Sequence, residues 1–420
     1  MYQLSDYSYD LPDTAIAQTP AEPADSAKLL IPSPDGTFFD TCVYELPHIL
    51  SQNDVLFFND TRVVQARIPL QNTRVVTRVW REVILEDAEI FFLEKISDNR
   101  CEALISLLKR NRPWTKIYIS DTIVAEIIEL TNKWVILDVV WCTIDELLEN
   151  YGKMPLPPYI QTTDETQKKY QTVFAKHDWS VAAPTASLHL TPWLLDSLKV
   201  KWIQTEYVTL HVWLWTFKPV DTSDIRDYHI HEETIIIDQS IFASIAMLKS
   251  QGKKIVAVWT TVSRVLETLP YVRDALCDWP YVTPDIDPGS IFSDMDSGSS
   301  PEWQINSAEW QNDMNYELRV QEYRNTITKN ITPTDTQKYI LDIKDIWDNK
   351  LQIKTRIFMY PGFEWKIVDS LMTNFHLPGS TLLMLVSSFI WYEKCMQIYE
   401  YAIKNDYRFF SFGDAMLLKK

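Results

Sequence analysis

Four polar side chains with different chemistry fall within eight residues near the end of the chain: Asp369, Thr373, Asn374 and His376. A carboxylate and an imidazole can carry protons near neutral pH, and a hydroxyl and an amide can hold a ligand by hydrogen bonds. The group therefore predicts a site for proton transfer. The alternative is a buried strand and turn in which His376 is a core histidine with its hydrogen bonds satisfied.

The elements around this group are predicted by its flanks. Tyr360-Pro-Gly362 is typical of a turn, and Pro378-Gly-Ser380 closes the segment. Ser380 is a favourable N-cap, so we expect a helix over Thr381–Tyr392. Because a helix N-terminus attracts negative charge, this corner is also suited to an anion.

A second polar group follows the apolar run Asp54–Phe58, which predicts a buried strand. It reads Asn59-Asp60-Thr61-Arg62, and polar residues at the end of a strand often contact ligands in α/β folds. The planar guanidinium of Arg62 suits a carboxylate. The alternative is a structural ion pair between Asp60 and Arg62.

Further candidates lie in the second half of the chain. The apolar run Lys254–Val258 leads into Thr260, Thr261 and Arg264. His189, His211 and Glu233 are candidate proton carriers from three other segments, and their types fit general acid–base chemistry. The histidines lack the i, i+4 helical pairing typical of zinc sites, so we expect no metal.

Composition restricts the class of protein. With 420 residues, 46% of them hydrophobic and 23% charged, the chain fits a globular protein with one large and one smaller domain. No apolar run reaches the roughly 18 residues needed to cross a bilayer, and the first residues lack the features of a signal peptide. We therefore expect a cytoplasmic protein without a membrane segment. The five cysteines form no C-x-x-C pair, which favours reduced thiols over zinc or disulfides.

The pattern of short runs divides the chain. Residues 70–150 hold five or six short β-branched runs between turns, which predict a small barrel or sandwich. Residues 1–69 and 151–420 alternate strand and helix patterns, which predict a largely parallel α/β main domain. The fold class expected is thus an α/β main domain with an inserted small all-β, barrel-like domain. Residues 275–355 are acidic and polar, and we expect them to be a variable surface insertion.

Several ordered motifs together resemble the family of S-adenosylmethionine:tRNA ribosyltransferase-isomerases, enzymes of queuosine synthesis. The matching pieces near the C-terminus are Tyr360-Pro-Gly362, Lys366-Ile-Val-Asp369, Thr373-Asn-Phe-His-Leu-Pro378 and Ser380-Thr-Leu382. Asn59-Asp-Thr-Arg-Val63 also matches, and the resemblance covers nearly everything outside 275–355. Two departures stand near the start, where Ala24 and Lys28 replace arginines usual in the family.

The resemblance implies an activity. The ribosyl group of S-adenosylmethionine would be transferred and isomerised onto the aminomethyl group of 7-aminomethyl-7-deazaguanine at the tRNA wobble position. The product would be epoxyqueuosine-tRNA, with adenine and methionine released and no metal required. His189, His211, His376, Asp369 and Glu233 are then the catalytic candidates. The candidates for binding the cosubstrate are Asn59, Asp60, Thr61, Arg62, Thr260, Thr261, Arg264, Tyr360 and Asn374.

Two rival functions remain open. One is an S-adenosylmethionine-dependent tRNA methyltransferase, although the chain has no G-x-G-x-x-G fingerprint. The other is a non-catalytic tRNA-binding relative. For the favoured function we expect a monomer in which the polar groups at Asn59–Arg62, His189, His211, Thr260–Thr261 and Thr373–His376 converge on one cleft.

The net charge of −17 bears on the tRNA partner. It argues against broad nucleic-acid binding, so lysines and arginines would have to gather in a positive strip beside the cleft. The candidate runs are Lys109-Arg110-Asn-Arg112, Lys168-Lys169 and Lys253-Lys254. Each of these runs is equally compatible with an ordinary solvated surface.

Glycine and tryptophan are present in abnormal numbers. The chain has 8 glycines and 16 tryptophans, whereas an average chain of this length has roughly 29 glycines. Tryptophan also stands where the family pattern has glycine, at Trp114, Trp179, Trp202, Trp213, Trp215, Trp259 and Trp391. We hypothesise that the organism reads UGA as glycine. The alternative is a lineage with real tryptophans and a remodelled pocket. With tryptophan in place, we expect at least one of the indoles of Trp213, Trp215 and Trp259 to project into the cleft.

Overall fold

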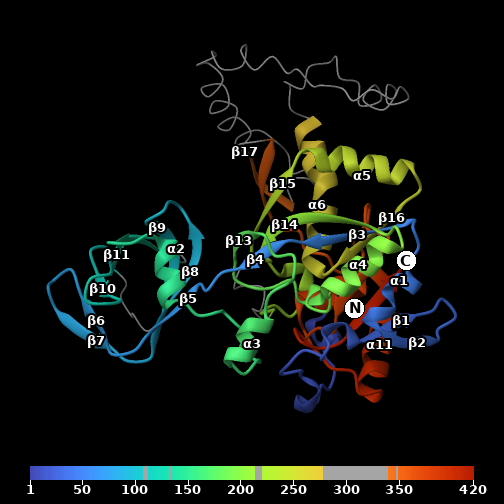
Figure 1. The fold of residues 1–420 in the computed structure, drawn as a ribbon, viewed down its shortest axis with the longest axis horizontal. Helices are drawn as coiled ribbons and strands as arrows, with labels where there is room; N and C mark the ends of the chain where they lie inside the picture. The colour runs from blue at the N-terminus through green and yellow to red at the C-terminus, as the bar shows by residue number, and fades with distance from the viewer. Residues whose placement is uncertain (107–111, 132–133, 213–219, 278–338, 347–348) are drawn as a thin grey trace, which may run out of the picture.

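The computed structural model describes residues 1–106, 112–131, 134–212, 220–277, 339–346 and 349–420. These residues form two parts, each built on a β-sheet (Figure 1). The larger part holds both ends of the chain, and the smaller part projects to one side. The expected fold class, an α/β domain with a small all-β domain, is confirmed.

The larger part is organised around a ten-stranded sheet. Its strands follow in the order β17 (Ile340–Ile346), β18 (Lys350–Thr355), β15 (Glu233–Asp238), β14 (Gln204–His211), β3 (Asp54–Asn59), β16 (Lys254–Val258), β19 (Ser370–Asn374), β20 (Ala415–Lys419), β1 (Lys28–Pro32) and β2 (Phe38–Cys42). The four central strands β14, β3, β16 and β19 run parallel to one another. Their carboxyl ends therefore lie along one edge of the sheet.

Helices cover this sheet. They are α1 (Leu46–Ile49), α4 (Pro192–Val200), α5 (Ser240–Ser250), α6 (Thr260–Cys277), α10 (Thr381–Ile390) and α11 (Tyr392–Lys404). The short helix α3 (Asp164–Lys169) lies away from the sheet, near the connection between the two parts (Figure 1). α6 follows β16 directly and packs on all four central strands. None of the helices in the described ranges is long and apolar enough to span a bilayer.

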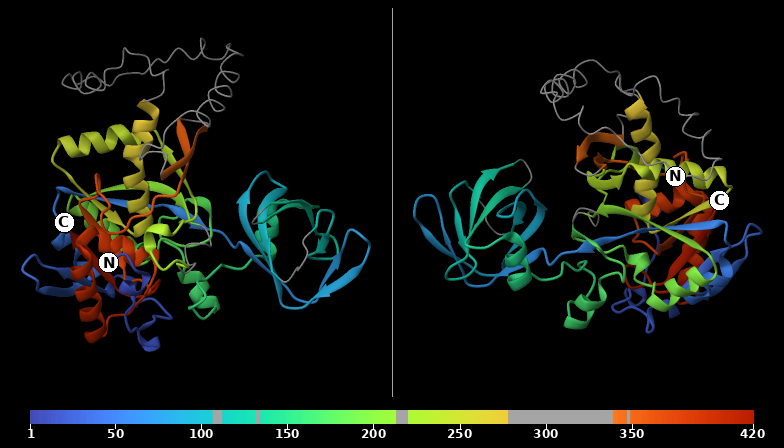
Figure 2. Two further views of the ribbon diagram at one scale, coloured as in Figure 1. Left: turned by 180° about the vertical axis from the view of Figure 1, so that it is seen from behind. Right: turned by 45° about the horizontal axis from the view of Figure 1, so that its top comes forward.

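The smaller part is an antiparallel sheet of eight strands that curls into a barrel-like shape (Figure 2). Its strands, in spatial order, are β5 (Arg67–Leu70), β8 (Ala88–Lys95), β9 (Arg100–Ile105), β12 (Val135–Val140), β11 (Val124–Leu130), β10 (Lys116–Tyr118), β6 (Thr73–Val76) and β7 (Glu82–Leu85). α2 (Ile144–Tyr151) packs its apolar face on the core of this sheet. A separate pair, β4 (Thr61–Val63) and β13 (His177–Ser180), lies in the larger part where the two parts meet.

The central strands form where the sequence predicts them. All six residues of β3 are buried, as expected for a parallel strand covered on both faces. At the start of α10, Ser380 Oγ accepts a hydrogen bond from the backbone N–H of Leu383 at 3.2 Å, which confirms the predicted N-cap.

Two expectations about the elements are wrong. The helix predicted over Thr381–Tyr392 ends at Ile390, because Trp391 has a φ of +72° and cannot continue a right-handed helix. A new helix then begins at Tyr392. Residues 340–346 and 350–355, expected within the acidic insertion, instead form β17 and β18 of the main sheet, where β18 pairs with β15. The rest of the expected insertion, 278–338, lies outside the described residues.

Candidate functional site

The polar candidates gather at the carboxyl edge of the parallel strands. Asn59, His211 and Asn374 are the last residues of β3, β14 and β19, and Trp259 directly follows β16. Open α/β sheets bind ligands at this edge. Two cavities lie here, one large and one small.

Asn59 braces this edge. Its side-chain amide donates to Leu210 O at 3.0 Å, and its Oδ1 accepts from the backbone N–H of Leu210 at 3.1 Å and of Thr61 at 3.2 Å. Thr61 Oγ1 in turn lies 2.9 Å from His211 Nδ1. Asn59 and Thr61 were predicted to bind the cosubstrate, but in the structure both position neighbouring strand ends.

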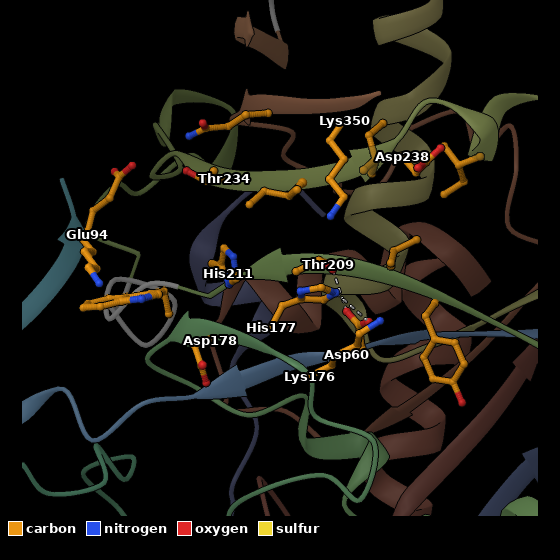
Figure 3. Close-up of a pocket in the computed structure, with 18 of the residues that line it drawn as sticks. Asp60, Glu94, Lys176, His177, Asp178, Thr209, His211, Thr234, Asp238 and Lys350 are labelled. Carbon is orange, nitrogen blue, oxygen red and sulfur yellow. Dashed lines mark hydrogen bonds and ion pairs between the residues drawn. The ribbon is translucent and has the colours of Figure 1, made fainter. Parts of the chain in front are cut away.

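The large cavity has a volume of about 880 Å³ and lies between the two parts of the molecule (Figure 3). Asp60 lies in its wall, where Thr209 Oγ1 donates to Asp60 Oδ1 at 2.7 Å. His177 Nε2 approaches the other carboxylate oxygen of Asp60 at 3.6 Å. Sequence reasoning missed His177, whose only signal was an imidazole twelve residues before the candidate His189.

His211 also lines the large cavity. Burial, and to a smaller extent the nearby His177, lowers the pKa of His211 to about 4. The imidazole of His211 is therefore neutral at pH 7. A neutral imidazole can accept a proton.

The small cavity has a volume of about 310 Å³ and is lined by Asn374 and His376, at and just after the end of β19. His376 Nε2 lies 2.9 Å from Thr373 Oγ1. Asn374 Oδ1 accepts from Thr185 Oγ1 at 2.9 Å, and its amide lies 3.2 Å from His189 Nε2. Burial lowers the pKa of His376 to about 3 and that of His189 to about 4. His376 and Asn374 reach the cavity directly, whereas His189 contacts the site through Asn374.

A buried ion pair lies near the start of α6, where Arg264 is the fifth residue. Arg264 Nη1 is 2.5 Å from Glu233 Oε2, and the two side chains are 3% and 0% exposed. Arg264 Nε and Nη2 have no hydrogen-bond partner among the described residues. The hydroxyls of Thr260 and Ser263 also lack a partner there. Buried donors in native proteins are normally satisfied, so this turn is suited to receive the acceptors of a ligand.

Three predicted residues are not brought into this group. Asp369 precedes β19 and so lies at the opposite end of that strand from Asn374; its Oδ2 accepts from Lys249 Nζ at 2.6 Å and from the backbone N–H of Ile255 at 2.7 Å. Tyr360 packs in an aromatic group with Tyr2 and Phe358.

Arg62 is the third. It is half exposed and lies 3.7 Å from Asp178, while Asp60 faces His177. The alternative of an ion pair between Asp60 and Arg62 is therefore wrong.

The charges around the large cavity are mixed. Its lining includes the lysines Lys95, Lys176 and Lys350 together with the acids Asp60, Glu94, Asp178, Glu206 and Asp238. Of the predicted basic runs, Lys253-Lys254 lies at the amino end of β16, away from both cavities. In the Lys168-Lys169 run, Lys169 is paired with Glu22 and Glu165. Lys109 and Arg110 lie outside the described residues. A positive strip beside the site remains a prediction.

Three comparisons place the chain among known proteins. A family model described as queuosine biosynthesis protein matches residues 4–296 and 320–418. Proteins named S-adenosylmethionine:tRNA ribosyltransferase-isomerase match from end to end. The one from Sulfurihydrogenibium sp. is 35% identical over 419 residues, covering 99% of both chains. The one from Thermosynechococcus vestitus is 34% identical over 425 residues, covering 99% of this chain and 96% of its own. A crystal structure of an S-adenosylmethionine tRNA ribosyltransferase from Thermotoga maritima is 25% identical, with a TM-score of 0.45, and the match covers 98% of this chain and 99% of that one.

Proposed function

Because this chain belongs to the family of queuosine biosynthesis proteins, we propose that it transfers and isomerises the ribosyl group of S-adenosylmethionine onto tRNA. The acceptor is the aminomethyl group of 7-aminomethyl-7-deazaguanine at the wobble position, and the product is epoxyqueuosine-tRNA. The enzyme acts as a monomer in the cytoplasm, where tRNA is found. The observation that carries the proposal is the end-to-end match to the ribosyltransferase-isomerases, since it includes every segment that contributes to the two cavities.

The large cavity is the proposed site of the tRNA base. It opens between the two parts of the molecule, and its wall holds Asp60 beside His177 and Thr209. An aminomethyl group is a cation near neutral pH, so a carboxylate is a suitable partner for it. Asp60 is thus assigned to the acceptor base instead of the cosubstrate.

The small cavity and the first turn of α6 are the proposed site of S-adenosylmethionine. Two guanidinium nitrogens of Arg264 have no partner in the part of the chain that the structure describes, and they suit the carboxylate of the methionine portion. The cavity of about 310 Å³ is at the small end of the range for ligand sites, and the Trp259 indole stands in its wall.

The chemistry requires one group that removes a proton beside the sulfonium and one that protonates the departing adenine. His211 and His376 line the cavities in the neutral form and are the proposed bases. His189 positions Asn374, and Glu233 holds Arg264. Asp369 lies at the other end of its strand and is assigned a structural role.

Release of free adenine tests the function. S-adenosylmethionine is incubated with the protein and with tRNA that carries the aminomethyl-deazaguanine base, and adenine and methionine are measured. Equal release of both supports ribosyl transfer. Formation of S-adenosylhomocysteine without adenine would instead identify a methyltransferase.

A second candidate function follows from Trp259. With the indole in the wall of the small cavity, the printed sequence fits a non-catalytic tRNA-binding relative. Calorimetry with S-adenosylmethionine on the tryptophan-bearing chain separates the two functions, because a non-catalytic relative would bind tRNA and no S-adenosylmethionine.

A further inference from the structure

The backbone at most of the tryptophans has the conformation of glycine. Ten tryptophans lie in the described residues, at 80, 114, 134, 141, 179, 193, 202, 259, 365 and 391. Seven of them have φ between +58° and +89°: Trp80, Trp114, Trp141, Trp179, Trp202, Trp259 and Trp391. In this region a Cβ atom meets the neighbouring peptide, so it is normally left to glycine.

The other residues in that region show how unusual this is. Among the described residues that are neither glycine nor tryptophan, five have positive φ. Four of these are Asn or Asp, which tolerate the left-handed conformation through their short polar side chains. The fifth is Phe410, in the wall of the small cavity. Four of the six described glycines also have positive φ. Tryptophan in this chain therefore occupies left-handed backbone about as often as glycine does.

One pair makes the equivalence direct. Trp202 stands two residues after the last residue of α4 and has φ +60°. Its N–H donates to Lys199 O at 2.9 Å, and the N–H of Ile203 donates to Leu198 O at 3.0 Å. Gly252 stands at the same position after α5, with φ +71°. Its N–H donates to Lys249 O at 3.0 Å, and the N–H of Lys253 donates to Leu248 O at 2.9 Å. Both ends are Schellman motifs, in which this position is usually glycine.

Most of these side chains add no packing that would explain an indole; the exceptions are Trp259, which is buried, and Trp179, which packs against the core of the smaller part. Five of the seven are between 62% and 85% exposed: Trp80, Trp114, Trp141, Trp202 and Trp391. Trp365, by contrast, has an ordinary backbone, donates from Nε1 to Ser388 O at 3.1 Å and packs its ring on Phe389. Trp365 is used as a tryptophan, and the five exposed indoles are not.

We infer that the seven positions are glycine in the protein that the organism makes, because its ribosomes read UGA as glycine. Trp213 and Trp215, which the family pattern also assigns to glycine, lie outside the described residues. The positive φ angles single out individual positions, which the composition does not.

The inference has a consequence for the site, which rests on the proposed function. Trp259 has φ +89°, is 4% exposed, lines the small cavity and directly precedes Thr260, the first residue of α6. Glycine at 259 removes the indole next to the turn that carries the unpartnered hydroxyl of Thr260 and the guanidinium of Arg264. The cavity then has room for S-adenosylmethionine.

Peptide mass spectrometry of the protein isolated from its source cells tests the recoding. We expect glycine at the seven positions and tryptophan at 365 in the same digest. Tryptophan at 202 or 259 in the native peptides would overturn the inference, whatever the recombinant chains do. The peptide over 207–220 extends the test to positions 213 and 215.

Calorimetry on recombinant chains tests the pocket separately. One chain carries glycine at all seven positions, and its matched control carries glycine at six and keeps Trp259. We expect the first to bind S-adenosylmethionine and the second to lose measurable binding. If native peptides carry glycine and both chains bind alike, the recoding stands and the pocket assignment fails. If the seven-glycine chain binds S-adenosylmethionine and releases no adenine with its tRNA, the proposed function fails instead.

Discussion

The guanidinium of Arg264 lies 2.5 Å from the carboxylate of Glu233 where neither side chain is more than 3% exposed. Removing two charges from water is costly, and their attraction compensates only when the remaining donors are also satisfied. Here Arg264 Nε and Nη2 are without a partner among the described residues. The pair is therefore incomplete in a way that an anionic ligand would complete.

Arg264→Lys should weaken binding of the cosubstrate. An ammonium keeps the charge opposite Glu233 and cannot present the planar set of donors. Loss of charge-assisted hydrogen bonds worth about 1.5–3 kcal/mol corresponds to roughly a 10- to 150-fold rise in the KM for S-adenosylmethionine. Steady-state kinetics of the seven-glycine chain, with and without Arg264→Lys, measures this change in KM. A fall in kcat with unchanged KM would contradict a binding role.

Three buried histidines should make stability depend on pH. Burial holds the pKa of His189 and His211 near 4 and that of His376 near 3, against 6.5 for an exposed imidazole. Between these values the unfolded chain binds protons that the folded chain does not, so stability is full above pH 6.5 and falls as the pH drops toward 4. His189 and His211 each contribute up to about 3 kcal/mol to this loss, and His376 up to about 5 kcal/mol.

Urea unfolding at pH 7.5 and at pH 5 measures the effect of these histidines. His189→Gln should flatten the difference between the two midpoints, because glutamine does not titrate. As bases, His211 and His376 stay neutral down to about pH 5, so they should add no acidic limb to the rate above that pH. A variant with an unchanged pH difference would show that His189 is not the group responsible.

Trp202→Gly should stabilise the protein, against the usual effect of truncating a large side chain. The indole is 78% exposed, so little packing is lost, and glycine relieves a left-handed conformation that costs about 1–2 kcal/mol. Trp193→Gly is the matched control, since Trp193 is 62% exposed in the first turn of α4 with an ordinary backbone. It should destabilise the protein by about 0.5 kcal/mol. We expect the urea midpoints of the two variants to shift in opposite directions. Shifts in the same direction would contradict the argument.

Asp60→Asn should impair reaction with tRNA and spare binding of S-adenosylmethionine. The carboxylate faces the large cavity beside His177, where the cationic aminomethyl group is placed. We expect a loss of about 100-fold in kcat/KM for tRNA, equal to one charge-assisted contact of about 2–3 kcal/mol. Asp178→Asn, at a half-exposed carboxylate of the same cavity, should change it by less than about fivefold. Weaker cosubstrate binding in Asp60→Asn would return this residue to the cosubstrate site.

The central strands and the residues at their ends could be predicted from the sequence, because a buried parallel strand is a continuous apolar run followed by polar residues. Asp54–Asn59 and Lys254–Val258 are of this kind. β17 and β18 could not be predicted in this way. They mix charged and apolar residues at the margin of the sheet, and they follow a long acidic stretch. Asp369 was misplaced because a motif gives the order of residues, whereas the direction of β19 decides which edge each one reaches.

The split between two cavities was also beyond the sequence. The polar groups were expected in one cleft, and they do share one edge of the sheet. Which cavity each side chain faces depends on packing between strands, as with Thr61 against His211 and Asn374 against His189. The family pattern had named five of the seven tryptophans with a glycine-like backbone, whereas Trp80 and Trp141 were found only from their φ angles.

Binding of tRNA should weaken steeply with salt, and the lysines at the large cavity should carry part of that dependence. Lys176 and Lys350 line it on the side of the main domain. If each meets a phosphate, Lys176→Ala or Lys350→Ala should reduce the slope of log K against log salt by about 1. Lys253→Ala is the control, because Lys253 stands just before the amino end of β16, away from both cavities, and binds Gln52 O at 2.7 Å. Filter binding across a salt series measures all three. With a net charge of −17 a non-specific electrostatic attraction is not available, so equal slopes for all variants would place the tRNA on another face of the protein.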